Sequence, residues 1–338
     1  MLRVIGCFTQ EHDFRLVFAA AFVCLLGSVL TVRLFMRARK ATEIAGRLQI
    51  GLTAIVGGAM IWATHFIAML AYDPVVDHGY EPIMTAASLL FAIIGVTLSL
   101  SIATSMAHKF SMELGGGVFG LTVATMHYLG MSAFLVPGKI VWDPVLVAAS
   151  VILGAGFGAI SFQRIGRPVT RYCWLGGALA MVLAICTMHF TGMGAITIKL
   201  DPTIVVPPNP LSDTALAILV LASVIVVLLM GLSAFMIEAR LAQDARNELK
   251  IVTLTDTLTG LPNRLSLQNA LLAQDDQLKS RDHTVAVLTI DLDMFKQIND
   301  MYGHLAGDAA LITITKRIMR VLLPGEFIAR TGGDDFVA

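Results

Sequence analysis

The stretch "MHFTGMGA", residues Met188–Ala195, places a titratable histidine in the middle of an apolar run. Apart from this histidine, nearly all the residues from Leu175 to Ile198 are Ala, Val, Leu, Ile, Met or Gly. Ionisable residues inside segments of this kind usually face the interior of a helix bundle and mark function. His189 therefore raises the question of whether other histidines share its position.

The same short pattern occurs three times along the chain. It reads "THFIAM" from Thr64, "MHYLGM" from Met126 and "MHFTGM" from Met188. The histidines of the three copies are 62 residues apart: His65, His127 and His189. A fixed period of this length is the signature of an internal repeat. We expect each unit to be a pair of helices with the histidine in the outer half of the second helix, so that three imidazoles lie at one depth.

The first two thirds of the chain consist of long apolar runs with little charge between turns. The whole sequence is 56% hydrophobic and 14% charged, and most of the charge lies in the last third. Because a helix needs about 20 apolar residues to cross a bilayer, each long run is a candidate span. Seven runs qualify: Phe14–Met36, Leu48–Ala71, Ile83–Ala107, Leu114–Val136, Val145–Phe162, Tyr172–Ile198 and Ala215–Ile237. The predicted fold is a seven-helix transmembrane bundle followed by an α/β domain.

The connections between these runs alternate in charge. Arg and Lys lie between the first and second runs and after the third, fifth and seventh, whereas the other connections are acidic or Pro-rich. By the positive-inside rule, the N-terminus is outside and the part after the seventh run is cytoplasmic. The formal net charge of zero gives no sign of a nucleic-acid partner. Three of the four cysteines lie in or beside apolar runs, which does not indicate a disulfide framework.

Methionine recurs together with the histidines. It stands four residues after each histidine, at Met69, Met131 and Met193, and one residue before two of them, at Met126 and Met188. Residues four apart share one helix face, so each helix presents imidazole and thioether together. This ligand set suits copper, whereas hard cations prefer carboxylates. The alternative is that each histidine bonds a backbone carbonyl and the methionines fill the core; three copies at one depth favour a shared ligand or metal site.

With this repeated motif, residues 14–237 resemble the MHYT family of bacterial integral membrane sensors. The resemblance implies a metal site, with copper as the expected ion, near the outer face of the cell membrane. It also implies that the site senses a diatomic gas or the redox state. The chain departs from the family at Thr64, where the other two repeats have methionine, and a site that needs all three of those sulfurs is weakened there.

The polar segment "EARLAQDARNELKIVT" follows the last apolar run, and its helical spacing predicts a helix that leaves the membrane. A plain linker is the alternative. We therefore expect three parts: a membrane domain over 14–237, a signalling helix or linker over 238–254, and a soluble domain over 255–338.

The soluble part carries polar residues at the ends of predicted strands. It opens with "TDTLTGLPNRLSL", in which Asp256 and Thr257 could cap a helix. A strand pattern then runs into Asp291 and Asp293, a common position for a divalent ion and phosphates. Asn299, His304 and Asp308 follow and offer edges of the kind that bind a purine. In "FIARTGGDDFVA", Gly332 and Gly333 allow positive φ in a hairpin and close approach of a phosphate.

Together these motifs are similar to the GGDEF domain of diguanylate cyclases, which make cyclic di-GMP from two GTP molecules. The resemblance implies that Asp291, the Leu292 carbonyl and Asp334 bind Mg²⁺. It assigns the guanine to Asn299 and Asp308 with His304 close by, and the phosphates to Lys296 and Arg330. Asp334 and Asp335 are then the signature acids. Each domain of the family binds one GTP, so a homodimer is expected for catalysis.

Three departures from the family pattern bear on activity. Asp335 stands where the family prefers Glu, and a displacement of about 1 Å in a catalytic carboxylate can cost about a hundredfold in rate. The place of the family's inhibitory Arg-x-x-Asp site reads Leu-Pro-Gly-Glu over residues 323–326, so we expect no feedback inhibition. The match ends two residues past the signature, so we expect only the N-terminal half of the domain and no activity from the 338-residue chain alone.

Two functions of different classes remain open. The first is a membrane sensor that controls a diguanylate cyclase. The second is a sensor whose degenerate GGDEF domain binds GTP or docks a partner, with a phosphodiesterase domain as a possible next module. A seven-helix metal transporter fits less well, because a transporter rarely needs the soluble tail.

Overall fold

The computed structural model describes residue 6 and residues 11–74, 76–105, 109–201, 203–204, 209–278, 286–323 and 325–338. The chain divides into two compact units, Met1–Ala234 and Phe235–Ala338. The first unit consists of long helices with two short pairs of strands, and the second combines helices with a small three-stranded sheet.

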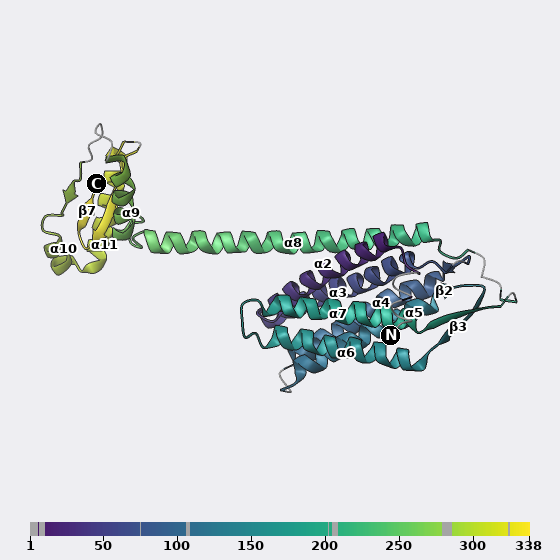
Figure 1. Cartoon of the computed structure of the whole chain (residues 1–338). Coiled ribbons are helices and arrows are strands. Elements are labelled where there is room, and N and C mark those ends of the chain that lie inside the picture. Colours follow the sequence, from purple (N-terminus) through teal and green to yellow (C-terminus); the bar gives the residue numbers. More distant parts are fainter. Residues whose placement is uncertain are drawn as a thin grey trace. The chain divides into compact units, whose positions relative to one another are not determined.

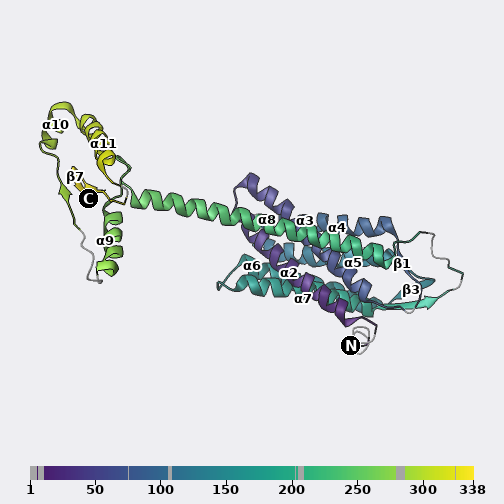
Figure 2. The ribbon, with the colours of Figure 1, turned by 90° about the horizontal axis from the view of Figure 1, so that it is seen from above.

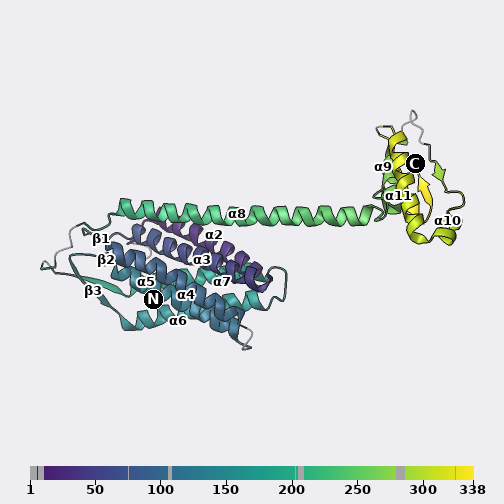
Figure 3. The same cartoon turned by 180° about the vertical axis from the view of Figure 1, so that it is seen from behind.

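The helices of the first unit lie side by side, as Figures 1 and 3 show. Their bounds are α2 (Phe14–Ala38), α3 (Glu43–Ala71), α4 (Pro82–Thr104), α5 (Ser111–Ser132), α6 (Pro144–Gly166) and α7 (Cys173–Gly194), and α8 (Asp213–Leu254) begins in this unit. The most extensive contacts join α2 to α3, α4 to α5 and α6 to α7. These are the helix pairs expected from the 62-residue repeat. The second helices of the pairs meet in the interior, where α5 contacts both α3 and α7.

The repeat is also visible in how helices begin and how they pack. Helices α4 and α6 both start with a proline after an acidic cap, and the carboxylates of Glu81 and Asp143 accept from the first free N–H groups. Inside the bundle, the Ser99 hydroxyl donates to the Gly115 carbonyl at 2.8 Å. Ser161 makes the equivalent bond one repeat later, at 2.7 Å to the carbonyl of Gly177. The repeat therefore fixes caps and helix contacts as well as the histidines.

Six of the described helices are long and apolar enough to cross a membrane: α2, α3, α4, α6, α7 and the Asp213–Leu241 part of α8. Helix α5 forms where the fourth run was expected but does not meet the same measure of hydropathy. Its sequence includes Glu113, His127 and three consecutive glycines, which lower the mean. It is an interior helix, in contact with α4, α6 and α7.

Short strands replace the ends of two predicted apolar runs. Strand β3 (Gly138–Trp142) pairs antiparallel with β4 (Ile196–Leu200), and β1 (Gly79–Tyr80) pairs with β2 (Phe134–Leu135). Figure 2 shows β3 at the end of the bundle away from the turn between α6 and α7. The extension of the sixth run as helix to Ile198 was wrong, because α7 ends at Gly194 and Ile196 begins an alternation of half-buried and exposed side chains.

The second unit contains α9 (Arg264–Leu278), α10 (Phe295–Tyr302), α11 (His304–Val321) and a sheet of β5 (Thr289–Ile290), β6 (Ala329–Gly332) and β7 (Asp335–Val337). The strand order is β5-β7-β6 with antiparallel pairing, and one parallel bridge joins Asn263 to Arg330. Leu261, Leu311, Ile328 and Phe336 form its core. The expected helix over 238–254 is present as the end of α8.

The cap of α9 differs from the sequence interpretation. Asn263 accepts from the N–H groups of Leu265 and Ser266, at 3.0 and 3.1 Å, so Asn263 and not Asp256 or Thr257 caps this helix. Asp256 instead accepts from Thr259 within the preceding turn. The expected two-glycine hairpin is confirmed: Gly332 and Gly333 have φ of 152° and 53° between β6 and β7.

Candidate functional site

Three buried imidazoles meet in the interior of the first unit. The Nδ1 atom of His65 lies 3.3 Å from Nδ1 of His189 and 3.2 Å from Nδ1 of His127. One ring nitrogen from each histidine lies within 4.8 Å of the other two. The three residues are 3%, 0% and 5% exposed. The repeat therefore brings together three nitrogen atoms that are 62 and 124 residues apart in the sequence.

Small residues on the neighbouring helix make room for the rings. A Cβ atom at Gly130 would lie 2.5 Å from Nε2 of His65, and one at Gly192 would lie 2.6 Å from Nε2 of His127. These glycines are themselves one repeat apart. The equivalent position in the first unit of the repeat is Ala68, which lines the same cavity as the histidines. The His65 and His127 imidazoles thus lie against the backbone of another histidine-bearing helix.

Hydrogen bonds among the three imidazoles cannot pair all of the ring nitrogens that meet at the centre. A neutral imidazole has one N–H donor and one acceptor nitrogen, so three Nδ1 atoms that face one another leave unpaired lone pairs or unpaired N–H groups. In addition, among the described atoms the three Nε2 atoms are buried without a hydrogen-bond partner. A cation bound by three Nδ1 lone pairs removes the conflict at the centre and leaves each Nε2 protonated.

The spacing of the nitrogens fits a metal ion. For an ion about 2.0 Å from each nitrogen, tetrahedral angles separate the nitrogens by about 3.3 Å. The two Nδ1–Nδ1 distances of 3.2 and 3.3 Å agree with this value. The alternative of histidines bonded to backbone carbonyls is not what the described contacts show, because Nδ1 faces other imidazoles and Nε2 has no partner.

The methionines divide into two sets around the histidines. A cavity of about 40 Å³ lies beside the three rings and is lined by Met126, Met188 and, in the first unit of the repeat, Thr64. The methionines four residues after each histidine are also buried but do not line this cavity: Met69, Met131 and Met193. The residue before each histidine therefore lies nearer the open space than the residue four positions later.

Sequence reasoning missed the glycines at Gly130 and Gly192 and the cysteine at Cys186, which also lines the cavity. A signal for the glycines was present, since each stands three residues after a histidine in two of the three copies. Cys186 stands three residues before His189, so the spacing placed it on the histidine face of its helix.

The histidine cluster is connected by packing to the start of α8. The Phe66 ring contacts the His65 ring edge-on at 4.7 Å between centroids, and it contacts the Tyr80 ring at 5.9 Å. The Tyr80 and Leu211 backbones exchange hydrogen bonds of 3.1 and 2.8 Å, two residues before α8 begins. Burial raises the pKa of the Tyr80 hydroxyl above its ordinary value, so this link is uncharged near neutral pH.

A second group of candidate residues lies in the second unit. The register pairs Ile290 with Phe336, which places Asp291, just past the end of β5, beside Asp335 at the start of β7. Asp334 precedes Asp335 in the hairpin turn. The structure thus brings the three acids to one end of the sheet, where Leu292 also follows β5. Asp291 and Asp335 are exposed and Asp334 is half-buried.

The residues expected to bind guanine, together with Lys296, lie on the helices α10 and α11. Asn299 in α10 packs closely against Gly307 in α11. A Cβ atom added at Gly307 would lie only 2.0 Å from the Asn299 side-chain oxygen. This brings Asn299 close to Asp308. Lys296 and His304 are exposed.

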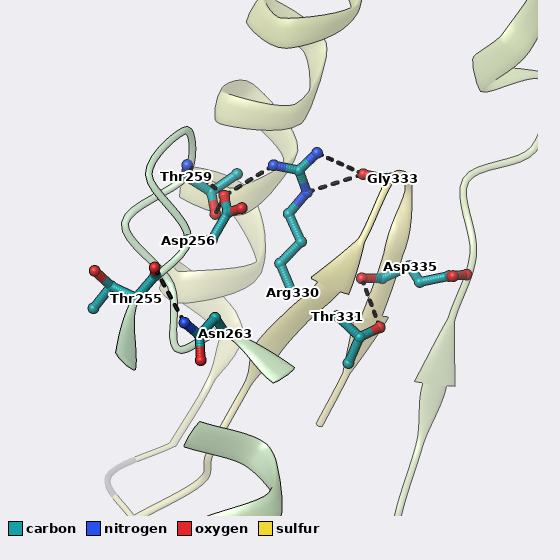
Figure 4. Close-up of polar contacts among 8 residues, drawn as sticks. All are labelled: Thr255, Asp256, Thr259, Asn263, Arg330, Thr331, Gly333 and Asp335. Atoms are coloured by element: carbon teal, nitrogen blue, oxygen red, sulfur yellow. Dashed lines mark hydrogen bonds and ion pairs between the residues drawn. The ribbon is translucent and has the colours of Figure 1, made fainter. Parts of the chain in front are cut away.

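Arg330 is held by the protein itself, as Figure 4 shows. Its guanidinium donates to the Asp256 carboxylate at 2.8 Å and to the Gly333 carbonyl at 2.9 and 2.6 Å. Burial raises the pKa of Asp256, but hydrogen bonds from Thr259 and Arg330 outweigh burial and hold that pKa below its ordinary value. Arg330 therefore ties the hairpin to the turn before α9.

Comparisons with known proteins match both units. A family model described as "Diguanylate cyclase, GGDEF domain" matches residues 253–338. One described as "Bacterial signalling protein N terminal repeat", the MHYT repeat, matches residues 58–116 and 120–177. An "Uncharacterized signaling protein" of Caulobacter vibrioides is 31% identical over 100% of this chain and 56% of its own length. The bifunctional diguanylate cyclase/cyclic di-GMP phosphodiesterase MucR of Pseudomonas aeruginosa is 33% identical over 88% of this chain and 47% of its own length.

Among solved structures, the coiled coil and GGDEF domain of DgcB from Caulobacter crescentus, in complex with c-di-GMP, is 29% identical over 31% of this chain and 56% of that chain, with a TM-score of 0.30. The chain spans about half the length of the curated relatives it matches.

The six apolar helices and the MHYT repeats indicate a membrane protein that carries a cyclase-type domain. The chain carries MHYT repeats ahead of a GGDEF domain, and the relatives that it matches include a GGDEF signalling protein.

Proposed function

We propose that this protein is a membrane sensor in which His65, His127 and His189 bind one copper ion and control a diguanylate cyclase. The observation that carries the proposal is the convergence of three buried imidazoles, with His65 Nδ1 at copper-ligand spacing from Nδ1 of both His127 and His189. Thioether sulfur from Met126 or Met188 supplies a soft neighbour for copper. The adjoining cavity of about 40 Å³ has room for a diatomic gas, and bound copper would supply either gas binding or a one-electron redox change.

The proposed orientation puts the N-terminus outside the inner membrane and the GGDEF domain in the cytoplasm, with seven spans that include α5. Basic residues at one end of the bundle support it: Arg39 donates to the Ile165 carbonyl at 3.2 Å and Arg167 pairs with Glu113 at 3.2 Å. Reporter fusions after Arg171 and after Arg240 should report the cytoplasm, and one after Asp77 the outside. Equal readings at Asp77 and Arg171 would rule out seven spans.

Helix α8 is the proposed route from sensor to cyclase. Val227 packs against Leu34 and Val56 of α2 and α3, and the Arg37 guanidinium donates to the Ala234 carbonyl at 3.2 Å. At the first residue of α8, the Asp213 Oδ1 atom lies 3.4 Å from Nε2 of His78. A shift of the histidine helices therefore reaches α8 through packed and hydrogen-bonded contacts.

For the cyclase, we propose that Asp291, the Leu292 carbonyl and Asp334 bind Mg²⁺ and that Asn299 and Asp308, with His304 nearby, bind the guanine of GTP. Lys296 and Arg330 meet the phosphates, and Asp335 acts beside the attacking 3′-hydroxyl. Mg²⁺ would neutralise charge on the triphosphate during phosphoryl transfer. Catalysis takes place in a homodimer, because each domain binds one of the two GTP molecules.

A second candidate function is a GTP-binding or docking module with little turnover. Two observations favour it: Asp335 is one methylene shorter than the expected Glu, and the Arg330 guanidinium is already engaged by Asp256 and Gly333. A phosphodiesterase domain farther along the parent protein would then carry the output.

The sensor proposal is tested by titrating copper into the purified protein and its single His→Ala variants. We expect each substitution at His65, His127 or His189 to weaken binding, with no rescue by the remaining pair, because all three approach one centre. Unchanged affinity in all three variants would refute the shared site. The variant Met69→Leu is the control, because Met69 does not line the cavity.

A further inference from the structure

Two cysteines of the helix bundle line adjoining cavities next to the histidine cluster. Cys186 of α7 lines the larger cavity together with His189, which is one helical turn away on the same face. Cys186 is partly exposed, so a small molecule in the cavity can reach its sulfur.

Cys24 of α2 is 1% exposed. It lines a smaller adjoining cavity, and that cavity shares Thr64 and Ile185 with the first. Helices α2 and α7 pack together, and the Cys24 and Cys186 side chains interact with each other. Cys173 is elsewhere: its sulfur accepts from the N–H groups of Val169 and Thr170 at the start of α7.

This geometry gives the two thiols different roles. A partly exposed thiol that lines the larger cavity can react with a small oxidant, whereas an almost fully buried thiol beside it reacts with the product. We propose that Cys186 and Cys24 form a peroxide-sensitive dithiol site, in which Cys186 is the reacting thiol and Cys24 the resolving thiol.

The chemistry balances in two steps. The Cys186 sulfur attacks one oxygen of hydrogen peroxide, the O–O bond breaks, and Cys186 sulfenic acid and water form. The Cys24 sulfur then attacks the Cys186 sulfur, the S–O bond breaks, and a disulfide and a second water form. Both thiol protons leave in the two waters, and peroxide takes up the two electrons that the sulfurs lose.

The disulfide would join α2 to α7. Helix α2 also carries Arg37, which holds the Ala234 carbonyl of α8, so the bond fixes a helix that contacts the output helix. The reaction uses side chains other than the histidines proposed to bind copper.

The test uses the whole chain in detergent, stripped of metal with a chelator and treated with hydrogen peroxide. Thiols are then counted by alkylation after denaturation, and linked peptides are identified by mass spectrometry. We expect two of the four thiols to disappear, as one Cys24–Cys186 disulfide, and to return after dithiothreitol. Full alkylation of both cysteines after peroxide, or a disulfide that includes another cysteine, would overturn the proposal.

Two substitutions separate the roles of the thiols. Cys24→Ser should accumulate sulfenic acid on Cys186 that dimedone traps, and Cys186→Ser should leave Cys24 unreacted. Sulfenic acid on Cys24 in the second variant would overturn the assignment. Cys173→Ser is the matched control and should behave as the unsubstituted chain does. The variant His127→Ala should still form the disulfide, which distinguishes failure of this site from failure of the copper site.

Discussion

Replacing Gly192 by alanine should weaken copper binding without removing any proposed ligand. The added Cβ atom would lie 2.6 Å from Nε2 and 3.1 Å from Cδ2 of His127. Ordinary contact begins at 3.4 Å, so the ring must move by about 0.8 Å to restore it. Metal–ligand distances tolerate only about 0.2 Å. Overpacking of this kind typically costs about 1–3 kcal/mol.

We therefore expect the copper affinity of Gly192→Ala to fall about 10–100-fold, as with disturbed partners of metal ligands in other proteins. Gly176→Ala is the matched control, because it lies in the same helix and its Cβ would meet nothing within 4 Å. Affinity is measured by competition with a copper chelator, and folding by the thermal midpoint. A Gly192→Ala protein that is folded and binds copper as tightly as the control would refute the reasoning about imidazole placement.

Three further predictions concern the output side. In the full-length parent, Asp335→Glu should speed formation of cyclic di-GMP from GTP, and product should accumulate without feedback inhibition; no product from the parent or this variant favours the docking module. Asp256→Asn should weaken the anchoring of Arg330 by about 1–3 kcal/mol at pH 7, seen as faster hydrogen exchange in β6. Because the folded-state pKa of Asp256 is depressed, this stabilisation is complete above its ordinary pKa and is lost as pH falls through the folded value, so the variant and parent should converge in acid. Arg37→Ala should uncouple cyclase output from copper while leaving copper affinity unchanged, and equal copper dependence in both proteins would contradict a role for α8.

The period of the sequence predicted the arrangement of the helices well. A strict 62-residue repeat required the three pairs to share one geometry, so His65, His127 and His189 had to lie at one depth. The repeat could not predict that Nδ1 and not Nε2 faces the centre, because ring orientation depends on contacts with Gly130 and Gly192. Those contacts are set by how closely the helices approach.

The ends of helices and the partners of side chains were harder to predict from the sequence. Hydropathy extended the sixth run to Ile198 because β-branched apolar residues suit a strand and a membrane helix alike. In the second unit, the motif residues could be located, but the pairing of Arg330 with Asp256 could not. That pair joins residues 74 positions apart, and only the tertiary fold brings them together.

The stoichiometry and coordination of copper test the central claim most directly. Metal analysis of the purified protein should give one copper per chain, and X-ray absorption should show three imidazole nitrogens at about 2.0 Å from it. The triple variant His65→Ala/His127→Ala/His189→Ala should bind no copper at this site. Copper at the stoichiometry of the unsubstituted protein in the triple variant would contradict the account and leave three histidines that only fill the core.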